Sequence, residues 1–347
     1  MKHSGYLTTS GAEIYYEQYG SGTPLLILHG NSQSLAVFYP FLRAFRPDFQ
    51  VILMDSRGHG RSRLSVRTAL CGFSTEDMAD DVIALLDHLH LSSVHLLGFS
   101  DGANIGLEIA CKYPERLRSL ICLSGNASPD GLLTPLYWAA QMQHAILAQL
   151  GNLLLPILTR RPSPHAPIAS ASPVTPDKGP VSTRPEASTR KMRSNVLKRD
   201  LTQILAEQRM CLGTFSRRAR SLATCFLFAR VRTHAERFLF HRTHFPMKQK
   251  KKPDFLVRLT HRVLRRRNLT SLLLHSPRLN AKKLQAISIP VLLIAGTRDL
   301  IKTSHSRWLA EQIPTSQLLL MTGGRHTTFF QEPAPYLRAI LAFLRRN

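Results

Sequence analysis

The chain has 347 residues, of which 44% are hydrophobic and 20% are charged. This amount of apolar material supports a sizeable core and excludes a wholly disordered chain. The five cysteines are an odd number and form no Cys-x-x-Cys pair, so neither a disulfide scaffold nor a zinc ribbon is expected.

The formal net charge of +24 is concentrated in one part of the chain. Residues 151–280 hold 27 Lys and Arg against 6 Asp and Glu, a net of +21, which leaves +3 for the other 217 residues. The average charge suggests a nucleic-acid binder, but its distribution indicates a near-neutral globular protein that carries a strongly basic insert.

Four apolar segments alternate with helix-like segments in the first 125 residues. A continuous hydrophobic run that ends in a turn residue is typical of a strand buried on both faces of a sheet. The predicted strands are 24–30, 49–55, 94–100 and 117–125. Helices are predicted between them, for example over residues 75–88. The alternation predicts an α/β fold in which a mostly parallel, twisted sheet is covered by helices.

The same pattern returns near the C-terminus. Strands are predicted over 289–299 and 316–324, a helix over 304–313 and a closing helix from Pro333 onward. The core is therefore expected in two parts, the first over residues 1–130 and the second over 289–347.

The region between these parts, residues 131–288, is interpreted as a cap region. Residues 156–185 contain eight prolines among Ser, Thr and Ala, and the chain from Lys191 to Arg267 is basic. Such segments bury little apolar surface, so residues 156–267 are expected to be poorly ordered.

No membrane span is expected. Residues 131–159 lack Asp, Glu, Lys and Arg, but they contain Gln141, Gln143, His144 and Gln149, which are costly in hydrocarbon. Amphipathic helices over a pocket explain this composition better. The first 20 residues lack the apolar core of a secretory signal, so a cytoplasmic protein is expected.

The strongest chemical signal is Gly98-Phe99-Ser100-Asp101-Gly102, a G-x-S-x-G between a buried strand and a helix. A serine on this tight turn is held in strained backbone geometry with its hydroxyl at the sheet edge, and the glycines allow strand and helix to approach closely. A helix-capping serine is the alternative, but the strand before and the helix after favour a nucleophile at Ser100.

A serine nucleophile needs a base and a carboxylate that orients the base. In this kind of sheet they follow in the order Ser, acid, His. Asp299 ends the predicted strand 289–299, and His326 follows the last strand, so these residues are the predicted acid and base. Asp130, just after the fourth strand, is the alternative acid.

The tetrahedral oxyanion requires two hydrogen-bond donors. Asp101, the residue after the nucleophile, is expected to supply one backbone N–H, and Asn31, after the first core strand, the other. These are backbone roles that constrain the side chains weakly. The Asp101 carboxylate is interpreted as an ordinary group at a helix N-terminus, with selection of a cationic substrate group as the alternative.

These motifs resemble those of the α/β-hydrolases, in the broad group of Ser-dependent esterases, lactonases, peroxidase-like and proline-aminopeptidase-like enzymes. The resemblance covers roughly residues 5–150 and 271–347 and implies a fold with a helical cap and no cofactor; no metal is expected either. In the turn 54–62, Arg57 and His59 are interpreted as structural. The motifs are HGN (29–31), MDSRGHGRS (54–62), GFSDGANIGLEIA (98–110), PVLLIAGTRD (290–299) and GGRHTTFFQEP (323–333).

The chain departs from the family pattern in residues 151–270. This insert is open to three interpretations: a polyanion-binding segment, a solvated insertion without a partner, or a retained non-coding or frame-shifted stretch. Any polyanion binding is expected to be weak and to involve residues 190–267.

The expected function is hydrolysis of a small-molecule ester or related acyl compound through an acyl-enzyme. Serine at the nucleophile position argues against reactions that use a carboxylate nucleophile, such as dehalogenation. The alternatives are an aminopeptidase or amide hydrolase of the same fold, and a non-enzymatic scaffold that binds polyanions.

Overall fold

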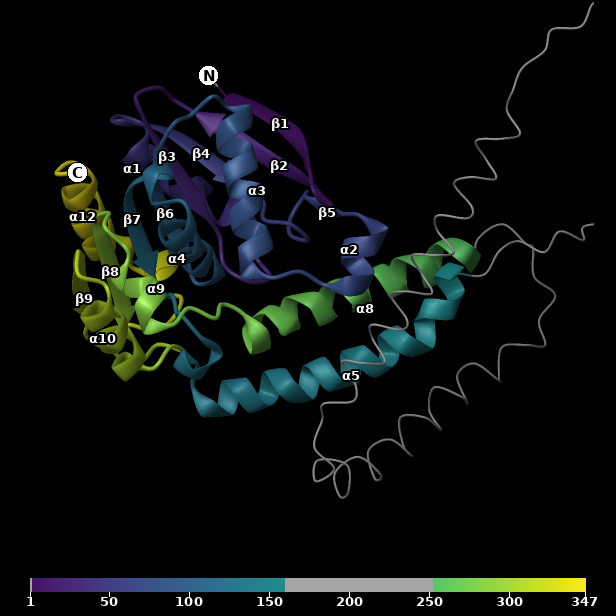
Figure 1. Cartoon of the computed structure of the whole chain (residues 1–347). Helices are drawn as coiled ribbons and strands as arrows, with labels where there is room; N and C mark the ends of the chain where they lie inside the picture. The colour runs from purple at the N-terminus through teal and green to yellow at the C-terminus, as the bar shows by residue number, and fades with distance from the viewer. Residues whose placement is uncertain (1, 160–251) are drawn as a thin grey trace, which may run out of the picture. The chain divides into compact units, whose positions relative to one another are not determined.

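A computed structural model of the chain describes residues 2–159 and 252–347 (Figure 1). In these described residues, nine strands form one sheet in the order β1-β2-β4-β3-β6-β7-β8-β9, with β5 paired to β2. The strands are β1 (Lys2–Thr9), β2 (Ala12–Tyr19), β3 (Thr23–Leu28), β4 (Phe49–Met54), β5 (Arg63–Leu64), β6 (Val94–Phe99), β7 (Leu117–Leu123), β8 (Val291–Gly296) and β9 (Ser316–Met321). The pairs from β4 through β3 to β9 are parallel, whereas β2 is antiparallel to its neighbours. The predicted α/β class with a mostly parallel sheet is therefore confirmed.

Helices cover both faces of the sheet, as Figure 1 shows. One face packs against α3 (Thr75–His88), α4 (Asp101–Lys112) and α10 (Thr303–Gln312). The other packs against α1 (Leu42–Phe45) and α12 (Pro333–Leu344), together with the 3₁₀ helix η1 (Leu35–Phe41) and α11 (Thr328–Gln331). The strands β6 and β8 are buried at every position, because they have helices on both faces.

Each central strand ends one to three residues earlier than its apolar run suggests. β3 ends at Leu28, β6 at Phe99 and β8 at Gly296. The polar residues that follow therefore lie in loops beyond the carboxyl ends of parallel strands. In an open α/β sheet this edge is where ligands bind.

Two long helices, α5 (Thr134–Thr159) and α8 (Lys252–His275), lie side by side in Figure 1 and are in contact. They fall in the region predicted to form a cap and are named the cap helices. His144 Nδ1 lies 3.3 Å from the Arg267 carbonyl oxygen, and Gly151 faces Leu264. Within the described ranges, the remaining α-helices are the short α2 (Val66–Cys71) and α9 (Ala281–Gln285).

The predicted boundary of poor order at residue 267 is wrong, because α8 begins at Lys252. Although this helix is rich in arginine, it buries an apolar face that includes Val263, Leu264 and Leu272. At the other boundary, α5 continues to Thr159. Residues 160–251 lie outside the described residues, so the expectation of poor order there stays a prediction.

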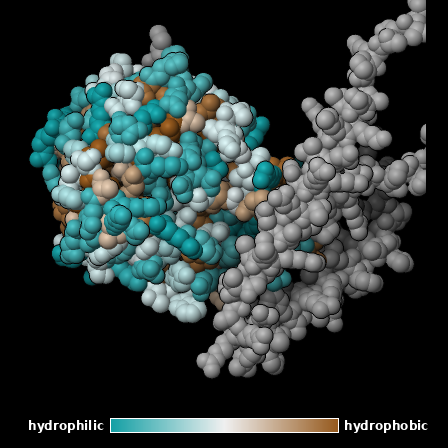
Figure 2. All heavy atoms as spheres, in the orientation of Figure 1, coloured by the Kyte–Doolittle hydropathy of each residue, from teal (hydrophilic) through white to brown (hydrophobic). Residues whose placement is uncertain are grey.

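The described surface on the face drawn in Figure 2 is mostly hydrophilic, with small separate hydrophobic areas. No helix in the described ranges is long and apolar enough to cross a membrane.

Candidate active site

Ser100 occupies the turn between β6 and α4. Its φ of 52° and ψ of −116° lie outside the ordinary regions for a residue with a side chain. Backbone in such regions costs about 1–3 kcal/mol and persists only where the surroundings hold it. Here the Ser100 N–H donates to the Leu123 carbonyl oxygen at 2.8 Å, and the Ser100 carbonyl accepts from the first turn of α4.

The two glycines of the G-x-S-x-G motif are required by close packing. A Cβ on Gly98 would lie 2.2 Å from the Gly102 carbonyl oxygen. A Cβ on Gly102 would lie 2.4 Å from the carbonyl oxygen of Leu28 in the neighbouring strand. Both distances are far below a normal contact, so strand, turn and helix can approach this closely only without side chains at these positions.

The structure brings Ser100, His326 and Asp299 together in one line of contacts. His326 Nε2 lies 3.1 Å from Ser100 Oγ, and His326 Nδ1 lies 2.6 Å from Asp299 Oδ1. The serine follows β6, the aspartate follows β8 and the histidine follows β9. Three separate stretches of chain therefore meet at one edge of the sheet.

Asp299 accepts hydrogen bonds from other groups besides His326. Its Oδ2 accepts from Ser124 Oγ at 2.7 Å, and its Oδ1 accepts from the Ile301 N–H at 3.2 Å. Burial acts to raise the pKa of Asp299, but the hydrogen bond and charge of His326, with the other donors, outweigh it and lower the pKa below its ordinary value. The carboxylate is therefore stabilised in its charged form.

Ser124 is a member of this site that the sequence motifs do not identify. It comes directly after β7 and has a positive φ of 56°. Its position at the carboxyl end of the strand beside β6 is the available signal. The alternative acid, Asp130, is exposed, and its carbonyl oxygen accepts from Lys302 Nζ at 2.8 Å. The carboxylate in contact with His326 is that of Asp299.

The loop after β3 lies beside the nucleophile turn. The Gly30 N–H donates to Gln33 Oε1 at 3.0 Å, so this amide is already occupied. The N–H groups of Asn31 and Asp101 have no acceptor within residues 2–159 and 252–347. Asp101 is the first residue of α4, where backbone N–H groups lack partners inside the helix.

The Asp101 side chain is buried instead of lying exposed at a helix end, with 4% of its surface accessible. Its Oδ2 accepts from Asn31 Nδ2 at 2.9 Å. Burial raises the pKa of Asp101 to about 6, although the Asn31 bond and the charge of His326 act in the opposite direction. The expectation that side chains at these two positions are weakly constrained is wrong, because they contact each other.

Aromatic rings cover one side of the histidine. The Phe99 ring lies 5.1 Å from the His326 ring and 4.9 Å from the Phe330 ring, which it meets edge to face. Phe330 belongs to α11, directly after the histidine loop. These contacts restrict the movement of the imidazole and reduce its exposure to water, so that 16% of the side chain is accessible.

Comparison with known proteins identifies the architecture around this site. Residues 23–153 match the family model described as the alpha/beta hydrolase fold. An esterase structure from Thermogutta terrifontis superposes with a TM-score of 0.57 over 99% of this chain and 98% of its own, at 20% identity. The chain has the α/β-hydrolase fold.

Curated relatives match about a third of this chain. RutD of Azorhizobium caulinodans, which carries the provisional name of a carbamate hydrolase, is 36% identical over 128 residues, or 37% of this chain and 47% of its own. YraK of Bacillus subtilis, an uncharacterized hydrolase, is 31% identical over 119 residues, or 34% and 43%. The chain thus spans about half the length of these relatives.

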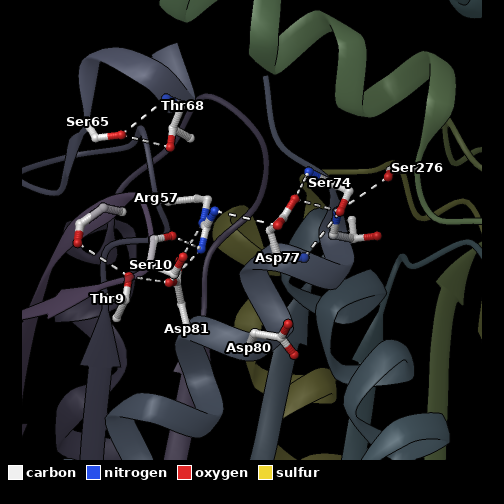
Figure 3. A network of polar contacts seen from close by, with 12 residues as sticks. Thr9, Ser10, Arg57, Ser65, Thr68, Ser74, Asp77, Asp80, Asp81 and Ser276 are labelled. Atoms are coloured by element: carbon white, nitrogen blue, oxygen red, sulfur yellow. Dashed lines mark hydrogen bonds and ion pairs between the residues drawn. The ribbon is translucent and has the colours of Figure 1, made fainter. Parts of the chain in front are cut away.

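Arg57, in the turn that links β4 to β5, forms a buried ion pair with Asp81 of α3 (Figure 3). Arg57 Nε donates to Asp81 Oδ2 at 2.6 Å, and an Arg57 Nη2 bond to Asp81 Oδ1 measures 2.8 Å. Asp81 Oδ1 also accepts from Thr9 Oγ1, and Arg57 lies 3.9 Å from Asp77. Arg57 connects the turn to α3 and contacts none of the three residues aligned at Ser100, which agrees with a structural role.

His59 in the same turn is fully buried. Its ring lies 5.0 Å from that of His29, and its Nδ1 lies 3.0 Å from the Arg57 carbonyl oxygen. Burial lowers the pKa of His59 to about 3, so its ring is neutral. Within the described parts of the chain, no cluster of three or more His, Cys, Asp or Glu side chains is arranged to hold a metal ion.

Proposed function

We propose that the protein is a serine hydrolase that cleaves an ester or related acyl compound of a small molecule. The main support for this proposal is that His326 contacts both Ser100 Oγ and the buried Asp299 carboxylate. A serine with strained backbone beside a histidine that a carboxylate orients is the arrangement needed to activate a hydroxyl.

In the proposed reaction, Ser100 Oγ attacks the acyl carbon while its proton passes to His326 Nε2. Asp299 accepts a hydrogen bond from Nδ1–H and stabilises the imidazolium. The N–H groups of Asn31 and Asp101 donate to the oxyanion of the tetrahedral intermediate. When the intermediate collapses, the bond to the leaving alcohol breaks and His326 donates the proton to its oxygen.

The second half of the reaction releases the acyl group. Water loses a proton to His326 Nε2 and attacks the acyl carbon, which forms a second tetrahedral intermediate. Its collapse breaks the bond to Ser100 Oγ, and the serine regains its proton from the histidine. The products are a carboxylic acid and an alcohol, and the chain returns to its starting state.

Reaction with a fluorophosphonate tests the nucleophile directly. The probe is expected to form a covalent adduct on a peptide that contains Ser100, and a Ser100→Ala variant is expected to remain unlabelled. An adduct on another serine, or no adduct on folded protein, would contradict the proposal.

A substrate panel separates the proposed ester hydrolysis from its alternatives. The panel contains p-nitrophenyl esters of increasing acyl length, an aryl carbamate and amino-acid p-nitroanilides. Faster turnover of esters supports the proposal, whereas faster turnover of anilides favours an aminopeptidase or amide hydrolase. The carbamate is included because of the name of the relative RutD.

A second candidate function is polyanion binding through the basic residues 190–267. In the described part of this segment, α8 exposes Arg258, Arg262, Arg265 and Arg266 along its length. Clustered cations release counterions from a phosphate backbone, so heparin affinity should fall steeply with salt. Alanine at Arg258, Arg262 and Arg266 is expected to reduce the salt slope by about one for each arginine that pairs with an anionic group.

A further inference from the structure

The side-chain amide of Asn31 connects three parts of the molecule at the candidate site. Its Nδ2 donates to Asp101 Oδ2 and to the Leu269 carbonyl oxygen, each at 2.9 Å. Its Oδ1 accepts from Ser32 Oγ at 2.8 Å. An amide turned the other way would place an oxygen against two acceptors, so these contacts fix its orientation.

The three parts are far apart in sequence. Asn31 lies in the loop after β3, Asp101 begins α4 beside the nucleophile, and Leu269 belongs to the cap helix α8. The backbone N–H of Asn31 belongs to the same residue as the bridging amide. The hydrogen bonds of this side chain therefore restrain the backbone whose N–H is assigned to the oxyanion.

We propose that Asn31 is a positioning residue whose side chain holds the oxyanion-binding loop in place against the nucleophile turn and the cap. This inference rests on the proposed serine-hydrolase function. It differs from the backbone role of Asn31, because replacing the side chain leaves the N–H in the chain. A displacement of about 1 Å in a catalytic group can reduce the rate on the order of 100-fold.

The hydrogen bond from Asn31 to Asp101 is strong because its acceptor is a carboxylate. Hydrogen bonds to a charged acceptor are roughly twice as strong as neutral ones, and the Asp101 carboxylate is buried away from competing water. When the Asn31 donor is removed, the pKa of Asp101 is expected to rise further, because that bond is among the contributions that lower it. Asp101 then takes up a proton, so the variant is expected to fold without a stranded buried charge.

Two substitutions test the role of the side chain with an ester as substrate. Asn31→Ala removes all three contacts, and Asn31→Asp keeps the size but removes both donors and places a carboxylate beside Asp101. Both are expected to lower kcat about 10- to 100-fold with KM changed less than about threefold. The aspartate variant should lose at least as much as the alanine variant at pH 8, because two carboxylates then face each other.

Ser32→Ala is the matched control, since it removes only the exposed bond to Asn31 Oδ1. It is expected to keep kcat within about threefold. Thermal unfolding of each variant establishes that kcat is measured on folded protein. Loss of turnover through partial unfolding would lower the amount of active enzyme that a fluorophosphonate labels, and this titration corrects kcat for it.

The outcomes separate this inference from the function on which it rests. Unchanged kcat in Asn31→Ala, or a raised KM with unchanged kcat, would overturn the positioning role and leave the hydrolase proposal intact. Turnover that survives in Ser100→Ala, or that is absent from the wild-type protein, would instead overturn the hydrolase proposal and this inference with it.

Discussion

The sheet and the cap helices are held by different kinds of contact. The central strands are fixed by apolar side chains on both faces, and β6 and β8 are buried along their whole length. The cap helix α8 adds polar bonds to its apolar face, with Arg267 and Asn268 both donating to the carbonyl of Ala69 in α2. A sheet built in this way can be predicted from the local hydrophobic pattern. The position of α8 instead depends on particular partners that are distant in sequence.

The largest expected effect concerns the sheet edge. Ser100→Ala should lower kcat for a p-nitrophenyl ester by a factor on the order of 10⁴ or more, because no other group replaces the attacking oxygen. The fold should persist, since alanine is smaller and the Ser100 N–H bond to Leu123 is retained. Initial rates and circular dichroism of the two proteins check this. A variant with a tenth of the wild-type activity would show that the nucleophile lies elsewhere.

The second prediction concerns the buried ion pair between Arg57 and Asp81. Arg57→Ala leaves the Asp81 carboxylate buried without its main partner, and breaking a buried pair in this way costs about 3–5 kcal/mol in the free energy of unfolding. Arg63→Ala removes an exposed pair with Glu13 and should cost less than about 1 kcal/mol. Urea unfolding of both variants measures the difference. Equal losses would argue that burial does not govern these two pairs.

The sequence predicts the sheet edge well for a physical reason. Carboxyl ends of parallel strands share one edge, so chain order alone puts Ser100, Asp299 and His326 on the same side of the sheet. The bond from Ser124 to Asp299 spans 175 residues, and that from Asn31 to Leu269 spans 238. No local period encodes such pairs.

The start of α8 is not predictable from the sequence for a related reason. Exposed arginines dominate the middle of this helix, whereas its last two turns carry none. Its apolar positions Val263 and Leu264 are buried only because α5 and the core lie against them. Tertiary packing therefore decides whether this basic segment forms a helix.

The third prediction concerns Asp101, which Asn31 links to the cap helix α8. Its pKa of about 6 lies above the ordinary 3.8, so the folded protein holds this proton more tightly than the unfolded chain. The resulting stability is fully present below pH 3.8 and is lost as pH rises through about 6. A difference of about two pKa units corresponds to about 3 kcal/mol.

Asp101→Asn removes this dependence, because the amide is neutral at every pH. The variant is expected to unfold at a higher temperature than the wild type at pH 8, and to lose this advantage at pH 4. Asp130→Asn, at an exposed position, serves as the control and should show little difference at either pH. A variant less stable than the wild type at pH 8 would show that the charged carboxylate stabilises the fold. A buried charge that costs stability is more readily explained by function than by packing.

The smallest expected effect concerns the hydrogen bond from Asn268 in α8 to Ala69 in α2. Asn268 is 2% exposed, and its Nδ2 donates to the Ala69 carbonyl oxygen at 3.0 Å, at the C-terminal end of α2 where carbonyls lack partners inside the helix. Asn268→Ala should therefore lower the free energy of unfolding by about 1–2 kcal/mol. Arg267 still donates to the Ala69 and Leu70 carbonyls, which limits the loss. Ser271→Ala on the same helix removes only a local exposed contact with His275 and should cost less than about 0.5 kcal/mol. Urea unfolding measures both losses of unfolding free energy. If the loss in Asn268→Ala is no larger than that in Ser271→Ala, the Asn268 hydrogen bond contributes nothing measurable, and apolar packing alone holds α8 as it holds the strands.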